Sequence, residues 1–176
     1  MSNHSHPAGH VAGIFVSSEA GAPMRFLDAA EAFAGQGLEG DRYQAGEGFM
    51  SQRQGGGLEL TLVETEALAE LSAENGIEIT PADSRRNIAT RDIRLNDLVD
   101  HDFQIGEAIC RGVRLCEPCA RIEKLVGKPF VKPMVHRAGL RADIIRSGTI
   151  RVGDSIRVLT SNSAIPGQSG SETASR

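Results

Sequence analysis

The stretch from residue 81 to residue 119 constrains the fold more than any other part of the chain. Its apolar residues fall in short runs that Asn, Asp and Gly interrupt, a pattern typical of successive strands and turns. These apolar residues are Ile88, Ile93, Leu95, Phe103, Ile105, Ile109, Val113 and Leu115. Long helical segments do not alternate with the runs, so the stretch disfavours a parallel α/β sheet. It predicts a mainly β domain.

The segments before this stretch add a hairpin, a loop and a helix. Residues 10–18 are rich in Val, Ile and Phe and lead into a turn, so they predict an opening strand and hairpin. Residues 35–48 contain five glycines and predict a long loop, a feature that is more often functional than idle in a compact domain. Residues 58–76 change period: alternating leucines predict a strand, and helical spacing then predicts a helix that stops at Gly76.

The segments after it add a second helix and more strands. Residues 120–127 predict a short helix that ends at Gly127. Turn signals at Ser147-Gly148 and Gly153-Asp154, each between β-branched residues, predict a final hairpin. Many short strands, glycine-rich connections and only two helices favour a closed or nearly closed β-barrel.

Length and composition favour a single domain with two tails. A chain of 176 residues, 40% of them apolar, is long enough to bury a core. We expect a flexible N-terminal tail over residues 1–9, the domain over 10–160, and a disordered tail over 161–176, which is rich in Ser and Gly. No apolar run approaches the roughly 18 residues of a membrane span, and the N-terminus lacks the apolar core of a signal peptide. The expected location is therefore the cytoplasm, without membrane contact.

The net charge of −4 conceals an uneven distribution. Residues 111–157 carry 11 Lys and Arg against 4 Asp and Glu, which is +7, and the rest of the chain carries 8 against 19, which is −11. A duplex-binding domain is usually basic overall and carries a reader motif, so nucleic acid is not an expected partner. The local cationic region suits a smaller anionic ligand, or it is only a solvated basic surface.

The basic region contains the segment CEPC, in which Cys116 and Cys119 flank a Glu-Pro pair. Three roles are open to these sulfurs: a redox disulfide, half of a zinc site, or a soft ligand for a metal cofactor. The redox motif belongs with alternating strands and helices, which are not predicted here. Structural zinc requires four ligands, and residues 10–160 contain neither a second CxxC nor an HxxxH. Cys110 lies in an apolar strand and is expected to be a small buried hydrophobic residue.

Five motifs occur in an order that resembles the MOSC domain, the C-terminal domain of molybdenum-cofactor sulfurases. They are GLEGDRY (37–43), LTLVETEAL (60–68), RRNIATRDI (85–93), QIGEAICRGVRLCEPCARIE (104–123) and GTIRVGDSI (148–156). The resemblance spans residues 10–158 and implies a MOSC-type β-barrel that binds the molybdenum cofactor, of the molybdopterin type, or its sulfur. At the level of the family it also implies an association with pyridoxal phosphate.

The resemblance implies roles for particular residues. By its position in the motif, Cys119 would ligate molybdenum as a thiolate, which nearby cations stabilise, and Cys116 would support the loop. Further residues would bind the cofactor, because arginine binds phosphate oxygens through two N–H groups at once, or would line the mouth of its pocket. These residues are Arg42, Arg85 and Asn87, the last two in an R-x-N-[IL] pattern, and His136, Arg137 and Arg141. Near the last three, the sequence AGLRA departs from the Gly-Gly or aromatic residue that is frequent in the family.

Two functions of different class are consistent with this resemblance. The first is an oxidoreductase that reduces N-hydroxylated compounds at a Cys119-ligated molybdenum, with electrons from a separate flavin or iron–sulfur reductase. The second is a non-catalytic carrier of sulfur or of the cofactor, with a persulfide on the same cysteine. Either form is expected to be a monomer or a homodimer.

Overall fold

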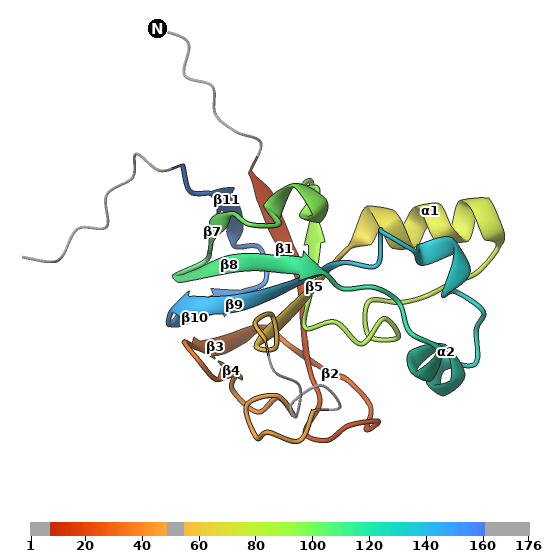
Figure 1. Ribbon diagram of the computed structural model, residues 1–176, viewed down its shortest axis with the longest axis horizontal. Helices are drawn as coiled ribbons and strands as arrows, with labels where there is room; N and C mark the ends of the chain where they lie inside the picture. Colours follow the sequence, from red (N-terminus) through yellow and green to blue (C-terminus); the bar gives the residue numbers. More distant parts are fainter. Residues whose placement is uncertain (1–7, 49–54, 161–176) are drawn as a thin grey trace, which may run out of the picture.

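The computed structural model describes residues 8–48 and 55–160, and it confirms a mainly β fold with a few short helices (Figure 1). The strands are β1 (Gly9–Val16), β2 (Arg25–Leu27), β3 (Ala29–Phe33), β4 (Gly37–Leu38), β5 (Leu60–Glu64), β6 (Ile88–Arg91), β7 (Asp102–Ile105), β8 (Ala108–Leu115), β9 (Leu140–Arg146), β10 (Gly148–Arg151) and β11 (Ser155–Val158). The helices are α1 (Thr65–Asn75), α2 (Ala120–Val126) and two 3₁₀ turns, η1 (Leu95–Leu98) and η2 (Lys132–Met134).

Seven of the described strands close into a barrel. They follow the order β11-β7-β8-β9-β5-β6-β1, and β11 also pairs with β1, which joins the two edges. Only the β5–β6 pair is parallel, and α1 lies in the connection between those two strands. Inward-facing side chains, including Phe103, Leu60 and Leu62, fill the barrel with an apolar core. Closure joins the two edges of the barrel, as the many short predicted strands favour. Among the described strands, β2 extends the same sheet beyond β1 and pairs with β1 alone.

The helix α1 forms where the sequence changes period. It follows β5 directly and ends at Gly76, whose φ of 66° is the left-handed conformation that glycine adopts without strain. Ala67 and Leu71 pack against Val63 on the outer face of the barrel, in a second apolar cluster with Phe130. Figure 1 shows α1 and α2 on the same side of the barrel. None of the helices in the described ranges is long and apolar enough to cross a membrane.

The opening hairpin is confirmed, because β1 pairs with β2 in antiparallel register, but the predicted final hairpin is wrong. β10 leaves the barrel and pairs with β3 in a three-stranded sheet, while β11 pairs with β7 and β1. The turns at Ser147-Gly148 and Gly153-Asp154 therefore redirect the chain between two sheets. Turn residues set a change of direction, and only long-range packing selects the partner strand.

The first strand of the described residues, β1, begins at Gly9, and the last strand, β11, ends at Val158. β1 begins at Gly9, which is buried, so this residue belongs to the barrel rather than to the tail predicted over residues 1–9. Residues 1–7 and 161–176 lie outside the described residues, and the predictions of flexible tails concern those segments.

Candidate functional site

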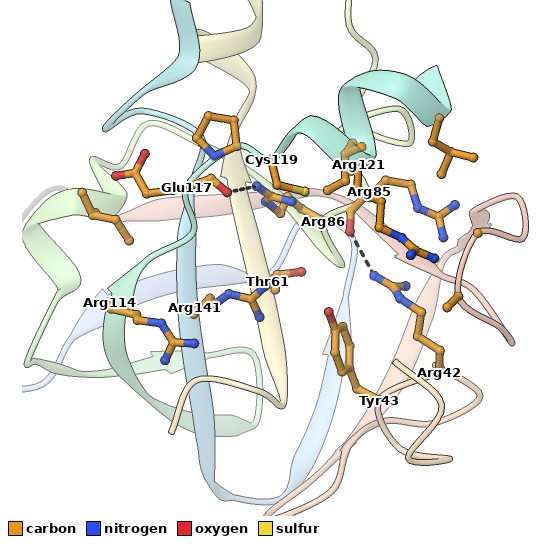
Figure 2. Close-up of a pocket in the computed structure, with 16 residues that line it drawn as sticks. Arg42, Tyr43, Thr61, Arg85, Arg86, Arg114, Glu117, Cys119, Arg121 and Arg141 are labelled. Atoms are coloured by element: carbon orange, nitrogen blue, oxygen red, sulfur yellow. Dashed lines mark hydrogen bonds between the residues drawn. The ribbon is translucent and has the colours of Figure 1, made fainter. Parts of the chain in front are cut away.

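A pocket of about 430 Å³ lies on the outer face of the barrel, over β5, β8 and β9 (Figure 2). Leu60 and Leu62 point into the core, so the intervening Thr61 points outward, and it lines the pocket. Pockets of this size hold small organic ligands. The polar lining consists of Arg42, Tyr43, Thr61, Arg85, Arg86, Arg114, Glu117, Cys119, Arg121 and Arg141.

The three cysteines occupy three different environments. Cys110 is fully buried in the barrel core, where loss of hydration raises the pKa of its thiol far above the usual range. Cys116 is also buried, and its N–H donates to Gly139 O at 2.7 Å. Cys119 is half-buried, lines the pocket and precedes the first residue of α2. Of the three thiols, only that of Cys119 can meet a ligand in the pocket.

Arg86 holds the CEPC segment in place. It is 5% exposed, and among the described residues its guanidinium donates to backbone carbonyls alone: Nε to Ala138 O at 3.1 Å, Nη1 to Ser84 O at 3.0 Å and Nη2 to Cys116 O at 3.0 Å. A longer contact joins Nη2 to Glu117 O at 3.5 Å (Figure 2). Within the described ranges no carboxylate pairs with this guanidinium. Arg86 therefore anchors the cysteine loop and leaves a positive charge beside it.

Arg42 and Arg85 form a cationic pair at one side of the pocket. Arg42 Nη2 donates to the backbone oxygen of Arg85 at 3.3 Å, and its Nη1 pairs with Asp41 Oδ1 at 3.2 Å. Its guanidinium lies 4.8 Å from the centre of the Tyr43 ring, a cation–π distance. Burial, and then the charge of Arg42, lower the pKa of Arg85. An anion beside both groups would relieve this repulsion.

The backbone of Arg85 is left-handed, with φ of 63°. A non-glycine residue rarely adopts this conformation, which costs about 1 kcal/mol or more and is found preferentially at functional sites. The side chain donates to Ala22 O and lines the pocket. The strained backbone lets consecutive residues face different surroundings: Arg85 faces the pocket, Arg86 the cysteine loop and Asn87 the barrel wall.

Asn87 lies outside the pocket, contrary to its predicted role in binding the cofactor. It is fully buried, and its Oδ1 accepts from the N–H and the hydroxyl of Thr61 at 3.2 and 2.9 Å. Its Nδ2 donates to Phe15 O at 3.2 Å. These bonds join β5 and β1 to the segment before β6, so the side chain stabilises the fold beneath the pocket.

His136 and Arg137 also lie outside the pocket. His136 has φ of 63° and binds the carboxylate of Glu117 through its backbone N–H and its Nδ1, both at 2.9 Å. These bonds outweigh the effect of burial and lower the pKa of Glu117. The carboxylate points away from the arginines (Figure 2). Arg137 pairs with Glu70 and Glu74 of α1, at 3.4 and 2.7 Å, so both predicted pocket-mouth residues act as braces.

Arg141, expected at the pocket mouth, lines the pocket, and so do Arg114 and Arg121, which sequence reasoning missed. The basic composition of residues 111–157 pointed to this region without singling out these side chains. Tyr43 follows Arg42 in the glycine-rich loop and was not singled out either. The pocket is therefore lined both by arginines of the basic region 111–157 and by Arg42, Arg85 and Arg86, which lie in the acidic remainder of the chain.

Comparisons with known proteins identify a family. The family model described as MOSC domain matches residues 53–157, a range that contains β5 to β10 and the CEPC segment and begins after Arg42. No curated protein matches the sequence. The YUAD protein from Bacillus subtilis has a TM-score of 0.72 at 17% identity, over 86% of this chain and 95% of that chain.

Two further crystal structures share the fold. YiiM from Geobacillus stearothermophilus has a TM-score of 0.64 at 12% identity, over 86% of this chain and 75% of that chain. YiiM from Escherichia coli has a TM-score of 0.61 at 15% identity, over 89% of this chain and 72% of that chain. At these identities the likeness establishes a common fold.

Proposed function

Because the chain belongs to the MOSC domain family, we propose that its arginine-lined pocket binds the molybdenum cofactor and that Cys119 ligates the metal. A single observation carries the proposal: among the three cysteines of the chain, only Cys119 lines the pocket. A thiolate is the soft protein ligand that suits molybdenum held by a dithiolene. Several arginines line the same pocket as Cys119, and their positive charge suits an anionic ligand there.

The chemistry of the pocket fits the rest of the cofactor. Within the described ranges, no three His, Cys, Asp or Glu side chains gather into a metal-binding group. A metal that uses Cys119 must therefore bring other ligands with it, as a dithiolene cofactor does. We expect Arg42 and Arg85, whose charges interact at one side of the pocket, to bind the phosphate of the cofactor, because guanidinium groups match its oxygens.

Pyridoxal phosphate fits this pocket less well. The usual anchor for that cofactor is a lysine that forms a Schiff base with its aldehyde. Lysine does not occur among the described residues that line the pocket. A phosphate could bind the arginines, but the covalent link has no partner there.

The activity that we propose is reduction of N-hydroxylated compounds. Each turnover consumes two electrons and two protons, releases water, and leaves the amine or amidine. When bound, the molybdenum cofactor supplies the metal that accepts the electrons and removes the hydroxyl oxygen. Cys110 and Cys116 are buried, so the chain offers no cysteine relay, and the electrons come from a separate flavin or iron–sulfur reductase. We expect a cytoplasmic monomer or homodimer.

A carrier role is the alternative, because the same geometry suits a persulfide. Cys119 is exposed enough to be sulfurated, and the surrounding arginines would stabilise the anionic sulfur. The protein would then deliver sulfur or cofactor without turnover of a substrate.

Metal and sulfur analysis separates the two functions. The full chain is produced in a host that makes the molybdenum cofactor, and molybdenum and cyanide-labile sulfur are measured per chain. Stoichiometric molybdenum that Cys119→Ser removes and Cys110→Ser retains supports the cofactor role. Labile sulfur on Cys119 without molybdenum supports the carrier role, and equal loss of molybdenum in both variants would refute the assignment of Cys119 as ligand.

A further inference from the structure

We infer that the pocket carries a second anion subsite, formed by Arg114 and Arg141, which binds a carboxylate or phosphate group. Arg114 near the end of β8 and Arg141 near the start of β9 are direct cross-strand partners. Paired residues in an antiparallel ladder point to the same face, and both side chains line the pocket. The inference deepens the proposed function, on which it rests, by naming a chemical feature of what the pocket binds.

The pair is electrostatically unfavourable without a ligand. Like charges placed directly opposite in a sheet destabilise it. Within residues 8–48 and 55–160, no carboxylate forms an ion pair with either guanidinium. The acid nearest along β9, Asp143, accepts from Gly57 N at 2.6 Å. An anion between Arg114 and Arg141 would remove the repulsion.

The two guanidinium groups are also held in place. Arg114 Nη1 donates to Gly56 O, and Arg141 Nη1 donates to Gly57 O at 3.3 Å. A guanidinium has five N–H donors, so each loop carbonyl occupies one of them and the others remain for a ligand. Side chains that are already oriented lose less entropy on binding, which favours affinity.

This subsite is separate from the Arg42 and Arg85 pair. Figure 2 shows Arg114 and Arg141 on one side of the pocket and Arg42 and Arg85 on the other, with Thr61 between them. Arg114 and Arg141 come from β8 and β9, whereas Arg42 and Arg85 come from the loops after β4 and before β6. Arg42 also has a counter-ion, Asp41, at 3.2 Å, so the positive charge of the Arg42 and Arg85 pair is partly neutralised.

The pocket can therefore hold two anionic groups at once. One is the phosphate of the cofactor, and the other has two possible sources: an acidic group on the substrate, or the nucleotide extension that some forms of the cofactor carry. Leu115, Ile122 and Leu125 also line the pocket, so an aromatic or aliphatic body attached to the anion finds apolar contacts. Both sources present the same chemistry to Arg114 and Arg141.

Titration of the full chain with benzoate tests the subsite without any catalysis. Benzamide, which has the same ring and no charge, serves as the reference ligand. We expect benzoate to bind more tightly than benzamide, and Arg114→Gln and Arg141→Gln each to weaken benzoate binding by roughly tenfold or more. Arg111→Gln is the matched control, because Arg111 lies on the same strand, is exposed and pairs with Asp102. Equal affinity for the two ligands, or an equal loss in the control, would overturn the inference.

Molybdenum content then identifies the source of the anion. If the substrate carries it, Arg114→Gln keeps the wild-type molybdenum content, and the KM for 4-carboxybenzamidoxime rises by roughly tenfold or more. If the cofactor carries it, the molybdenum content of Arg114→Gln falls. A wild-type protein that holds no molybdenum but binds benzoate through Arg114 and Arg141 would refute the proposed cofactor binding and still support the subsite. Failure of the proposed function can therefore be told apart from failure of the subsite.

Discussion

Replacing Arg86 with methionine should destabilise the protein more than any other single arginine change at the pocket. The guanidinium makes three bonds of 3.0 to 3.1 Å to the carbonyls of Ala138, Ser84 and Cys116. Methionine has a similar stem and no donor, so these carbonyls lose their partners. A bond to a charged group contributes about 1.5–3 kcal/mol, and leaving a buried polar group unsatisfied costs about 1–3 kcal/mol.

The three losses do not add fully. The carbonyls share one donor group, water can enter on relaxation, and removal of a buried charge recovers part of its desolvation cost. We therefore expect the free energy of unfolding to fall by about 3–5 kcal/mol. With an m value of about 2 kcal/mol/M in urea, the midpoint of unfolding falls by about 1.5–2.5 M.

Urea unfolding followed by circular dichroism measures this change. Arg157→Met is the control, because Arg157 is exposed on β11, and its loss should stay within about 0.5 kcal/mol. Arg86→Lys keeps the charge but loses the planar guanidinium, so its loss of unfolding free energy should lie between those of Arg86→Met and Arg157→Met. This variant can still be measured if Arg86→Met does not fold. A loss below about 1 kcal/mol in Arg86→Met would refute the reasoning, because the cysteine loop would then not depend on this side chain.

Three further outcomes are expected. In the folded protein only Cys119 should react rapidly with an aromatic disulfide reagent, so a fast thiol in Cys119→Ser would contradict its assignment to the pocket. Arg85→Ala should weaken cofactor binding by roughly tenfold to a hundredfold in titration, with the Arg157 control unaffected. Gly139→Ala should lower stability by more than about 2 kcal/mol, because φ is 118° and the new Cβ would lie 1.9 Å from Leu62 O. Gly153→Ala, also at positive φ but with no atom within 4 Å, should cost only about 1 kcal/mol in the same unfolding assay.

The limits of sequence reasoning are clearest at residues 85–87. The motif predicted that Arg85 and Asn87 bind the cofactor together, but their side chains face opposite surroundings, and Arg86 between them anchors the cysteine loop. The division coincides with the left-handed backbone of Arg85. No pattern of residue types predicts a positive φ at an arginine, because only the packing around it holds the strained conformation.

His136 and Arg137 show the same limit in another form. Each was expected at the pocket mouth from its place in the sequence, and each instead pairs with a carboxylate that is distant along the chain. Which acid meets which base depends on how α1 and the CEPC segment pack around the barrel. Conversely, Arg114 lies within the motif over residues 104–123 but was not singled out, and its place in the pocket comes from its register opposite Arg141.

By itself the sequence determined everything that depends on neighbouring residues: the mainly β character, the change of period before α1, the ends of both helices at Gly76 and Gly127, and the segment that holds Cys119. Such features follow from local backbone preferences and from side-chain periodicity, which act within a few residues. Only the tertiary structure decided that β10 pairs outside the barrel. It also decided that arginines from the basic region 111–157 and from the acidic remainder of the chain line one pocket with Cys119. Those outcomes depend on strand register and barrel closure, which are set by contacts between residues far apart in the chain.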